Sequence, residues 1–312
     1  MGMRIIFSIV IVILLFSCKE DPVTTPTNDP QELNIAKIDA VDKIEVVTWN
    51  VERFPKADHS DEYLEQFIDG LNADVYLLQE IQNNSKFGEV IGNLDDYSYF
   101  LQSNSTGQKL AIVYKNNVIS LKSTQEILIA DDHYFASRPP FLSNIEWSQG
   151  GVTKELFLLN IHYKCCGDDS IDVGNIDDQE YRRWKANDLM YNYILDNMSD
   201  KNVIAVGDWN DAIEEPKNTN VFQMFIDDNA NFQFVDMNIA QGSANNWSWQ
   251  GWNSSYSAIH FDHILINANL FDEYQNNSEV NVIKAEEYFE DGSSDYDAYL
   301  SDHRPVYFQF TP

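Results

Sequence analysis

Polar residues that can bind a metal ion or a phosphate group lie at the ends of most of the strand-like runs in this chain of 312 residues. They are Asn50, Glu80, His162, Asp208 with Asn210, Asp262, and Asp302 with His303. Each one alone has a structural explanation, because Asn and Asp commonly close strands in turns and Glu can cap a helix. As a set they combine hard oxygen ligands with two histidines, which indicates a chemical site.

The oxygen ligands in this set come from Glu80, Asp208, Asp302 and Asn50, and they suit Mg²⁺, Mn²⁺ or Ca²⁺. A structural zinc site is not expected, because the chain has few histidines and no clustered thiolates. Two histidines beside such a cation supply a general base and a general acid near neutral pH. Cleavage of a phosphate ester needs this combination of cation, base for water and assistance to the leaving oxygen.

The elements that must position these residues are strands with helices between several of them. The strand-like runs are Ile44–Trp49, Asp74–Gln79, Lys109–Tyr114, Leu156–Ile161, Val203–Val206, Phe261–Ile266 and Pro305–Phe310. Helical spacing of apolar residues predicts helices at Tyr63–Leu71 and Gln179–Met198. Strict alternation of strand and helix fails between Tyr97 and Leu159, so a mixed architecture with much antiparallel pairing is expected.

Several short motifs occur in a fixed order along the chain. They are Thr48-Trp49-Asn50, Leu77-Leu78-Gln79-Glu80, Ala111–Lys115, Asn160-Ile161-His162, Gly207-Asp208-Trp209-Asn210, Phe261-Asp262-His263 and Ser301-Asp302-His303. This order resembles the endonuclease/exonuclease/phosphatase superfamily, the fold group of deoxyribonuclease I, over nearly all of residues 44–312. The resemblance implies an α/β fold, a four-layer sandwich of two mixed, largely antiparallel sheets flanked by helices.

The resemblance also implies the metal site and part of its surroundings. Glu80 would be the principal metal ligand, with Asn50 and Asp302 completing or supporting the site. Asp208 and Asn210 would position the attacking water and the scissile phosphate. The expected cation is Mg²⁺, with Mn²⁺ and Ca²⁺ as alternatives.

Two histidines take the proton-transfer roles that the resemblance implies. His303, oriented by Asp262, would be the general base. His162 would donate a proton to the leaving oxygen or hydrogen-bond a phosphoryl oxygen. Relatives are interpreted differently on whether Asp or His activates water, so that point stays open. His263 is expected to be structural, because strand alternation sends it to the opposite face from Asp262.

Substrate contacts are predicted at Arg182 and Lys164, although a solvated helix face and a loop charge explain them equally well. Trp247, Trp249 and Trp252 could stack on a base or sugar, but aromatic packing is the favoured interpretation.

The first residues indicate export. Residues 1–17 have the apolar run of a signal peptide, and Leu15-Phe16-Ser17-Cys18 resembles a bacterial lipobox. Cys18 would carry the lipid, residues 18–43 would form a flexible tether, and residues 44–312 would form the catalytic domain. A plain secretory peptide and a short membrane anchor are the alternatives. The expected protein is a monomer, lipid-anchored to the bacterial cell envelope, with the outer-membrane surface as a further inference.

If Cys18 is lipidated, Cys165 and Cys166 remain, and adjacent cysteines cannot form a conventional disulfide framework. A vicinal disulfide and two free thiols are both compatible with the sequence. The formal charge of −30 repels polyanions at long range, although bound cations and local Lys or Arg can reverse the sign in one cleft.

The sequence thus predicts a divalent-metal-dependent phosphoester hydrolase, with an extracellular nuclease or phosphodiesterase as the leading interpretation. A phosphomonoesterase and a phospholipid or sphingomyelin phosphodiesterase are alternatives, and an inactive surface binding protein is a further one. Substrate, endo versus exo cleavage and metal identity are not specified by these motifs.

Overall fold

The computed structural model describes residues 30–103, 107–252 and 255–312, and in this part of the chain twelve strands form two six-stranded sheets. The first sheet has the order β11 (Glu279–Val282), β12 (Val306–Phe310), β1 (Ile44–Phe54), β2 (Val75–Ile81), β4 (Lys109–Lys115) and β3 (Tyr97–Leu101). The second sheet has the order β5 (Ile119–Glu126), β6 (Phe141–Gln149), β7 (Val152–His162), β8 (Val203–Asp208), β10 (Asp262–Asn267) and β9 (Phe232–Phe234). The pairs β1–β2 and β7–β8 are parallel and the other adjacent pairs are antiparallel, which confirms the predicted mixed sheets.

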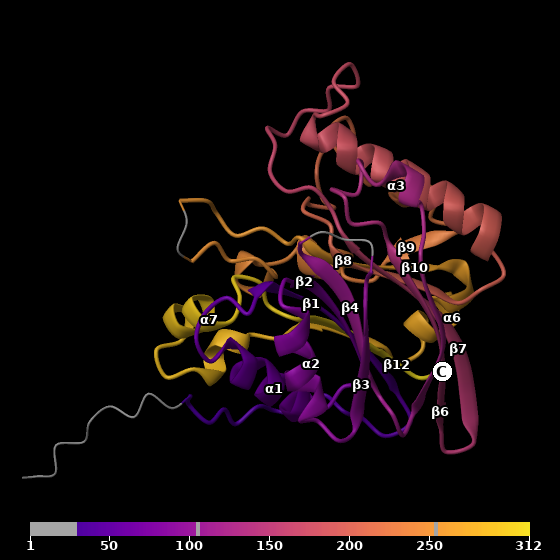
Figure 1. The fold of residues 1–312 in the computed structure, drawn as a ribbon. Helices are drawn as coiled ribbons and strands as arrows, with labels where there is room; N and C mark the ends of the chain where they lie inside the picture. Colours follow the sequence, from indigo (N-terminus) through magenta and orange to yellow (C-terminus); the bar gives the residue numbers. More distant parts are fainter. Residues whose placement is uncertain (1–29, 104–106, 253–254) are drawn as a thin grey trace, which may run out of the picture. The chain divides into compact units, whose positions relative to one another are not determined.

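Helices cover the outer faces of both sheets (Figure 1). Those against the first sheet are α1 (Ser60–Leu71), α2 (Asn84–Gly92) and α7 (Ser293–Tyr299), and those against the second are α3 (Gln179–Met198), α4 (Gln223–Asp227) and α5 (Met237–Ala240). The remaining short elements are α6 (Phe271–Gln275) and the 3₁₀ helices Ile129–Asp131, Ala244–Asn246, Ala268–Leu270 and Ala285–Tyr288. The two helices predicted from apolar spacing are therefore found in α1 and α3.

Alternation along the strands produces three apolar layers. In β1, Val46 packs between the two sheets, whereas Val47 and Trp49 pack against the helices of the first sheet. In β8, Ile204 lies between the sheets and Ala205 lies toward α3. Successive side chains of a strand point to opposite faces, so buried strands fill both layers. Helix, sheet, sheet and helix form the four-layer α/β sandwich that the sequence predicted.

The predicted start of the domain at Ile44 lies inside the compact unit, which begins at Gln31. Leu33 is buried in the same apolar layer as α1, and its backbone N–H donates to Gln66 Oε1 at 2.7 Å. The Gln31 N–H donates to the Tyr63 hydroxyl at 3.1 Å. Pro22, Pro26 and Pro30 among polar residues made residues 19–43 resemble a tether, but Leu33, Ile35 and Ile38 pack on the domain. Residues 18–29 of the predicted tether lie outside the described residues.

The signal peptide and Cys18 lie outside the described residues, so both stay predictions. Among the described helices, none combines the length and the apolar character needed to cross a membrane.

Candidate active site

Three of the predicted site residues come from strand ends that the sheet registers place together. Asp208, the last residue of β8, pairs with His162 of β7 and with Asp262 of β10. Alternation directs all three side chains into the layer between the sheets, on the same face as Ile204. Asn50 of the first sheet faces them, and its Nδ2 donates to Asp208 Oδ2 at 2.9 Å. The site therefore lies where the two sheets meet.

Glu80 reaches this site through an irregularity in β2. Gln79 points toward the second sheet and bonds Asn160, so regular alternation would send Glu80 to the helix side. Glu80 instead has φ 68°, and the β2–β4 register shifts between Leu78 and Ile81. A bulge of this kind re-aims one side chain. Glu80 Oε1 consequently lies 3.1 Å from Asn50 Nδ2.

Gly207 is required by the close approach of β8 to β7. Its φ is +149°, and a Cβ there would lie 1.9 Å from the Ile161 carbonyl oxygen. A side chain would therefore push apart the two strands that carry Asp208 and His162.

His303 and Asp262 form a buried pair. His303 Nδ1 lies 2.7 Å from Asp262 Oδ2, and His303 Nε2 lies 3.9 Å from Asp208 Oδ2. Burial alone would lower the His303 pKa, but Asp262, Asp208 and Asp302 raise it well above its ordinary value. Burial raises the pKa of Asp208 to about 7; the nearby Asp262 carboxylate adds to the rise, and His303 opposes it.

His162 has the opposite protonation preference. Burial, followed by the charges of Arg138 and His303, lowers the pKa of His162 well below its ordinary value. Its Nε2 lies 3.5 Å from Asp208 Oδ2 and 3.7 Å from Glu80 Oε1. Its Nδ1 is buried without a hydrogen-bond partner in the described part of the chain. A neutral imidazole favours the hydrogen-bonding role of His162 over the general-acid role.

The two asparagines hold the carboxylates in place. Asn50 bridges Glu80 and Asp208 through Nδ2, while its Oδ1 accepts the Glu52 N–H at 2.9 Å. In this arrangement Asn50 is a bridging donor, and its predicted support of the metal site stays a prediction. The backbone N–H of Asn210 donates to Asp208 Oδ1 at 3.0 Å, and its contact with substrate stays a prediction.

Asp302 is held by three neighbours. Its Oδ2 accepts the Trp249 indole N–H at 2.8 Å, and its backbone N–H donates to Glu52 Oε2 at 3.2 Å. Its Oδ1 lies 3.8 Å from His303 Nε2. Burial would raise the Asp302 pKa, but His303 and the Trp249 N–H lower it overall. Asp302 is thus an ionised oxygen ligand at the edge of the site.

The donor set fits a divalent cation. Glu80, Asp208 and Asp302 are linked through Asn50 and His303, and all three offer hard carboxylate oxygens. Crowding of carboxylates contributes to the raised pKa of Asp208, which a nearby cation would offset. One ligand atom from each of Asp208, Asp262 and His303 also lies within 4.8 Å of the others. Glu80 and Asp302, with Asp208 beside them, are the residues that would hold the ion.

Arg138 lies beside the site, although the sequence did not indicate it. Its guanidinium donates to the carbonyls of His162 and Tyr163 at 3.2 and 2.8 Å, and to Gln108 Oε1 at 2.9 Å. Gln108 in turn donates to Glu80 Oε2. Burial lowers the Arg138 pKa, and the nearby carboxylates Glu80 and Asp208 oppose that shift. Arg138 is a cation beside the site. Its loop does not follow a strand end, so the pattern of polar residues at strand ends did not indicate it.

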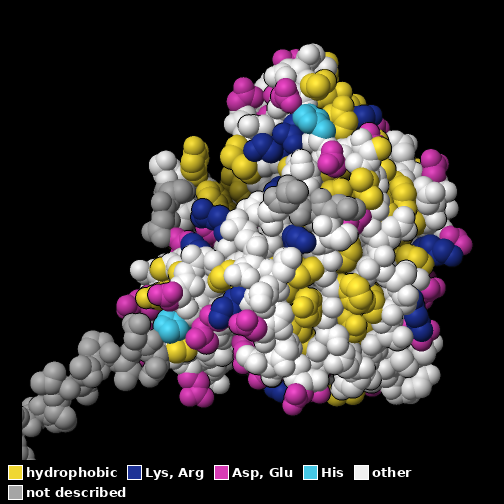
Figure 2. All heavy atoms as spheres, viewed as in Figure 1, with side chains coloured by type: hydrophobic (Ala, Val, Ile, Leu, Met, Phe, Trp, Pro, Cys, Tyr) yellow, Lys and Arg dark blue, Asp and Glu magenta, His cyan; other side chains and the backbone are white. Residues whose placement is uncertain are grey.

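The two predicted substrate residues, Arg182 and Lys164, lie in different surroundings. The Arg182 guanidinium donates to the His133 carbonyl, with Nε at 3.0 Å. Lys164 Nζ lies 3.6 Å from Cys165 Sγ in the exposed loop after β7. Contact of either residue with substrate stays a prediction. Acidic side chains are spread over the face drawn in Figure 2 with Lys and Arg among them, so the net charge of −30 is compatible with local cations.

His263 points away from Asp262, as strand alternation predicted. His263 Nδ1 lies 2.7 Å from Asp236 Oδ2 and its Nε2 lies 2.9 Å from the Asp211 carbonyl, on the α-helical side of β10. Cys165 and Cys166 are free thiols with their Sγ atoms 2.9 Å apart.

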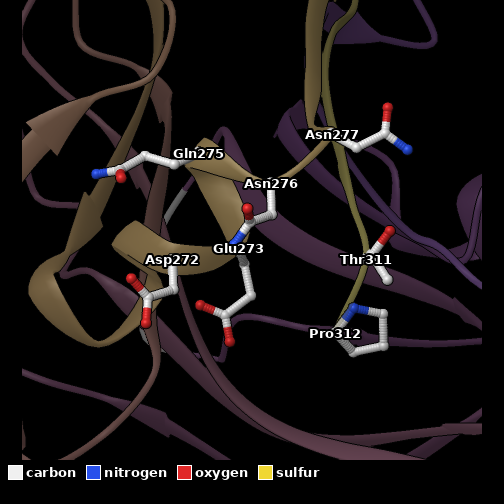
Figure 3. Close-up of a pocket in the computed structure, with 7 residues that line it drawn as sticks. All are labelled: Asp272, Glu273, Gln275, Asn276, Asn277, Thr311 and Pro312. Atoms are coloured by element: carbon white, nitrogen blue, oxygen red, sulfur yellow. The ribbon is translucent and has the colours of Figure 1, made fainter.

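Figure 3 shows a pocket whose lining includes no residue of the candidate site. It is lined by Asp272, Glu273, Gln275, Asn276, Asn277, Thr311 and Pro312. Thr311 follows Phe310, which pairs with Ile44 at the start of β1. Asn50 is six residues farther along that strand, or roughly 20 Å at the rise of a β-strand. The pocket is therefore separate from the candidate site.

Comparison with known proteins agrees with this geometry. Residues 47–303 match the model of the Endonuclease/Exonuclease/phosphatase family. The comparison with curated proteins gave no match.

Solved structures share the fold at low sequence identity. TDP2 of D. rerio, complexed with a single-strand DNA product, has a TM-score of 0.65 and 18% identity over 86% of this chain and 99% of that one. An endonuclease/exonuclease/phosphatase family protein of Bacteroides thetaiotaomicron has a TM-score of 0.58 and 13% identity over 86% and 97% of the two chains. A mannosyl-6-phosphatase of Bacteroides thetaiotaomicron VPI-5482 has a TM-score of 0.57 and 14% identity over 86% and 99%. The family match covers most of the chain, so this protein belongs to the endonuclease/exonuclease/phosphatase family of divalent-metal-dependent phosphoester hydrolases.

Proposed function

We propose that this protein is a Mg²⁺-dependent phosphodiesterase that cleaves nucleic acid outside the cell. The observation that carries the reaction class is the His303–Asp262 pair at 2.7 Å, with Asp208 3.9 Å from the other ring nitrogen of His303. A histidine oriented by a carboxylate is a base for water when its ring is neutral, and a cation bound beside Asp208 and Asp302 would favour that neutral state by offsetting the charges that raise the His303 pKa. Asp208 lies where it can orient that water.

The other residues bind and orient the phosphate. Glu80 and Asp302 would hold the cation, which when bound neutralises charge that develops on the phosphoryl oxygens. His162, neutral and buried beside Glu80 and Asp208, hydrogen-bonds a phosphoryl oxygen in this proposal. Arg138 adds a positive charge on the same side as Glu80.

Two aromatic rings support a nucleic-acid substrate. Phe261 is partly exposed and its ring centre lies 6.5 Å from that of His303, while Trp249 packs on Phe261 at 5.6 Å. Exposed aromatic rings beside a phosphate site can stack on a base or sugar. The net charge of −30 favours a second candidate, a small phosphomonoester, because it repels a long polyanion.

The same proposal includes the position of the enzyme in the cell. Cleavage after residue 17 and lipidation of Cys18 would anchor a monomeric domain to the bacterial envelope through residues 18–30. The apolar run before Ser17-Cys18 supports this part.

A panel of substrates tests the function directly. Purified residues 31–312 would be incubated with plasmid DNA, RNA, bis-p-nitrophenyl phosphate and p-nitrophenyl phosphate, with Mg²⁺ or with EDTA. The proposal expects Mg²⁺-dependent cleavage of a nucleic acid and of the phosphodiester. Cleavage of the monoester alone would select the second candidate, and no cleavage of any substrate would indicate an inactive binding protein.

A further inference from the structure

The segment Trp247-Ser248-Trp249 connects two parts of the site. One is the start of β10, which carries Asp262, and the other is the stretch that carries His303. Ser248 Oγ accepts the backbone N–H groups of Phe261 and Asp262, both at 3.1 Å. The Ser248 carbonyl accepts the Arg304 N–H at 2.8 Å, beside His303. This short segment therefore bonds to both stretches at once.

Trp249 extends the same connection with its side chain. The indole N–H donates to Asp302 Oδ2 at 2.8 Å. Trp249 is fixed from two sides, since its backbone bridges to Ile259 and to His303, and its ring packs on Phe261 with the ring centres 5.6 Å apart. A fixed donor on one carboxylate oxygen leaves Oδ1 on the side of His303 Nε2, 3.8 Å away.

The Asp302 side chain needs such a constraint because it is 30% exposed, whereas the Asp208 and Asp262 side chains are 2% and 0% exposed. An exposed carboxylate rotates about its side-chain bonds unless a partner fixes it. A hydrogen bond to a charged oxygen is among the stronger ones, and bonds from neighbours that orient a metal ligand change metal affinity.

We propose that Trp249 is a positioning residue that orients Asp302 toward the cation site through its indole N–H. The inference rests on the proposed metal-dependent function and assigns Trp249 a role beyond aromatic packing. It acts through Asp302 and requires no contact between the N–H and the substrate.

Two other tryptophans provide matched controls. Trp147 makes the same chemical contact, with its indole N–H on Asp74 Oδ2 at 2.8 Å, but Asp74 precedes the other end of the strand that carries Glu80. Trp247 lies two residues from Trp249, yet its indole N–H donates to the Ile239 carbonyl at 3.0 Å.

The test measures metal binding without turnover. Dissociation constants for Mn²⁺ and Mg²⁺ would be obtained by calorimetry and by metal-dependent shifts in melting temperature for the wild type and Trp249→Phe. Loss of the N–H is expected to weaken metal binding about ten-fold or more, the size seen when neighbours of metal ligands are removed. Trp147→Phe and Trp247→Phe are expected to bind the metal as the wild type does.

A double-mutant cycle shows whether Trp249 acts through Asp302. In an Asp302→Asn background, Trp249→Phe is expected to cause no further loss of metal affinity. Should Trp249→Phe misfold, a benzothiophene isostere of tryptophan removes only the N–H and serves as the second variant.

Each outcome decides one point. A wild type that binds neither metal contradicts the proposed function and this inference together. A wild type that binds metal, with both N–H-deficient variants unchanged, overturns the inference alone. An equal loss of affinity in the Asp302→Asn background would also overturn it, because the effect would then not pass through Asp302.

Discussion

His303 Nδ1 lies 2.7 Å from Asp262 Oδ2, and this contact leaves Nε2 as the only ring nitrogen that can face water. Asp262→Asn removes the negative charge of the carboxylate. The new amide can also donate to Nδ1 and so stabilise the tautomer of His303 that carries its proton on Nε2, which cannot accept a proton from water. The kcat is expected to fall by about 10²–10⁴, as in other hydrolases with a carboxylate-oriented histidine. Steady-state kinetics at saturating Mg²⁺ measure it. A kcat within a few-fold of the wild type would remove His303 from the role of base.

Gly207→Ala tests the close approach of β7 and β8. The new Cβ would lie 1.9 Å from the Ile161 carbonyl oxygen, so the variant should lose about 1–3 kcal/mol or more of unfolding free energy. Urea denaturation gives the value. Gly92→Ala is the control, because nothing lies within 4 Å of its Cβ, and it should be neutral or stabilising. Equal effects of the two substitutions would contradict the packing argument.

Arg138→Lys tests the cation that the sequence did not reveal. Lysine keeps the positive charge but cannot donate to the His162 carbonyl, the Tyr163 carbonyl and Gln108 at the same time. The kcat/KM should therefore fall about 10- to 100-fold. Arg182→Lys is the comparison, since its guanidinium bonds the His133 carbonyl. A larger loss for Arg182→Lys than for Arg138→Lys would show that Arg182, as first predicted, is the substrate contact.

The buried His263–Asp236 pair predicts a pH dependence of stability. Asp236 raises the pKa of His263 above its ordinary value despite complete burial. The pair's stabilisation is therefore fully present below the unfolded-state pKa of about 6.5 and is lost as the pH rises through the folded-state pKa. The loss of unfolding free energy above pH 6.5 should be steeper in the wild type than in His263→Gln. Urea denaturation in EDTA measures both slopes, and parallel slopes would contradict the prediction.

Much of the site was predictable because it depends on strand alternation. The motifs placed Asp208 and Asp262 at strand ends, and period-two alternation separated Asp262 from His263. Glu80 was assigned from its motif. Alternation alone would place its side chain on the opposite face, and the bulge in the backbone turns that side chain into the site.

Other features depended on contacts between distant parts of the chain. Arg138 belongs to a loop with Ala136 and Ser137 at positive φ, a conformation that these residue types do not signal. Trp249 was expected to pack, and its bond to Asp302 joins residues 53 positions apart. Residues 31–43 were assigned to the tether from composition, because the apolar layer that buries Leu33 is built by residues far along the chain.

Hydrolysis by three proteins, each with Mg²⁺ and with EDTA, tests the central claim most directly. The wild type should cleave bis-p-nitrophenyl phosphate only with the metal, while Glu80→Ala and His303→Ala should abolish that activity and keep the folded circular-dichroism spectrum. Unchanged turnover in both folded variants would contradict the assignment of this site as the catalytic centre.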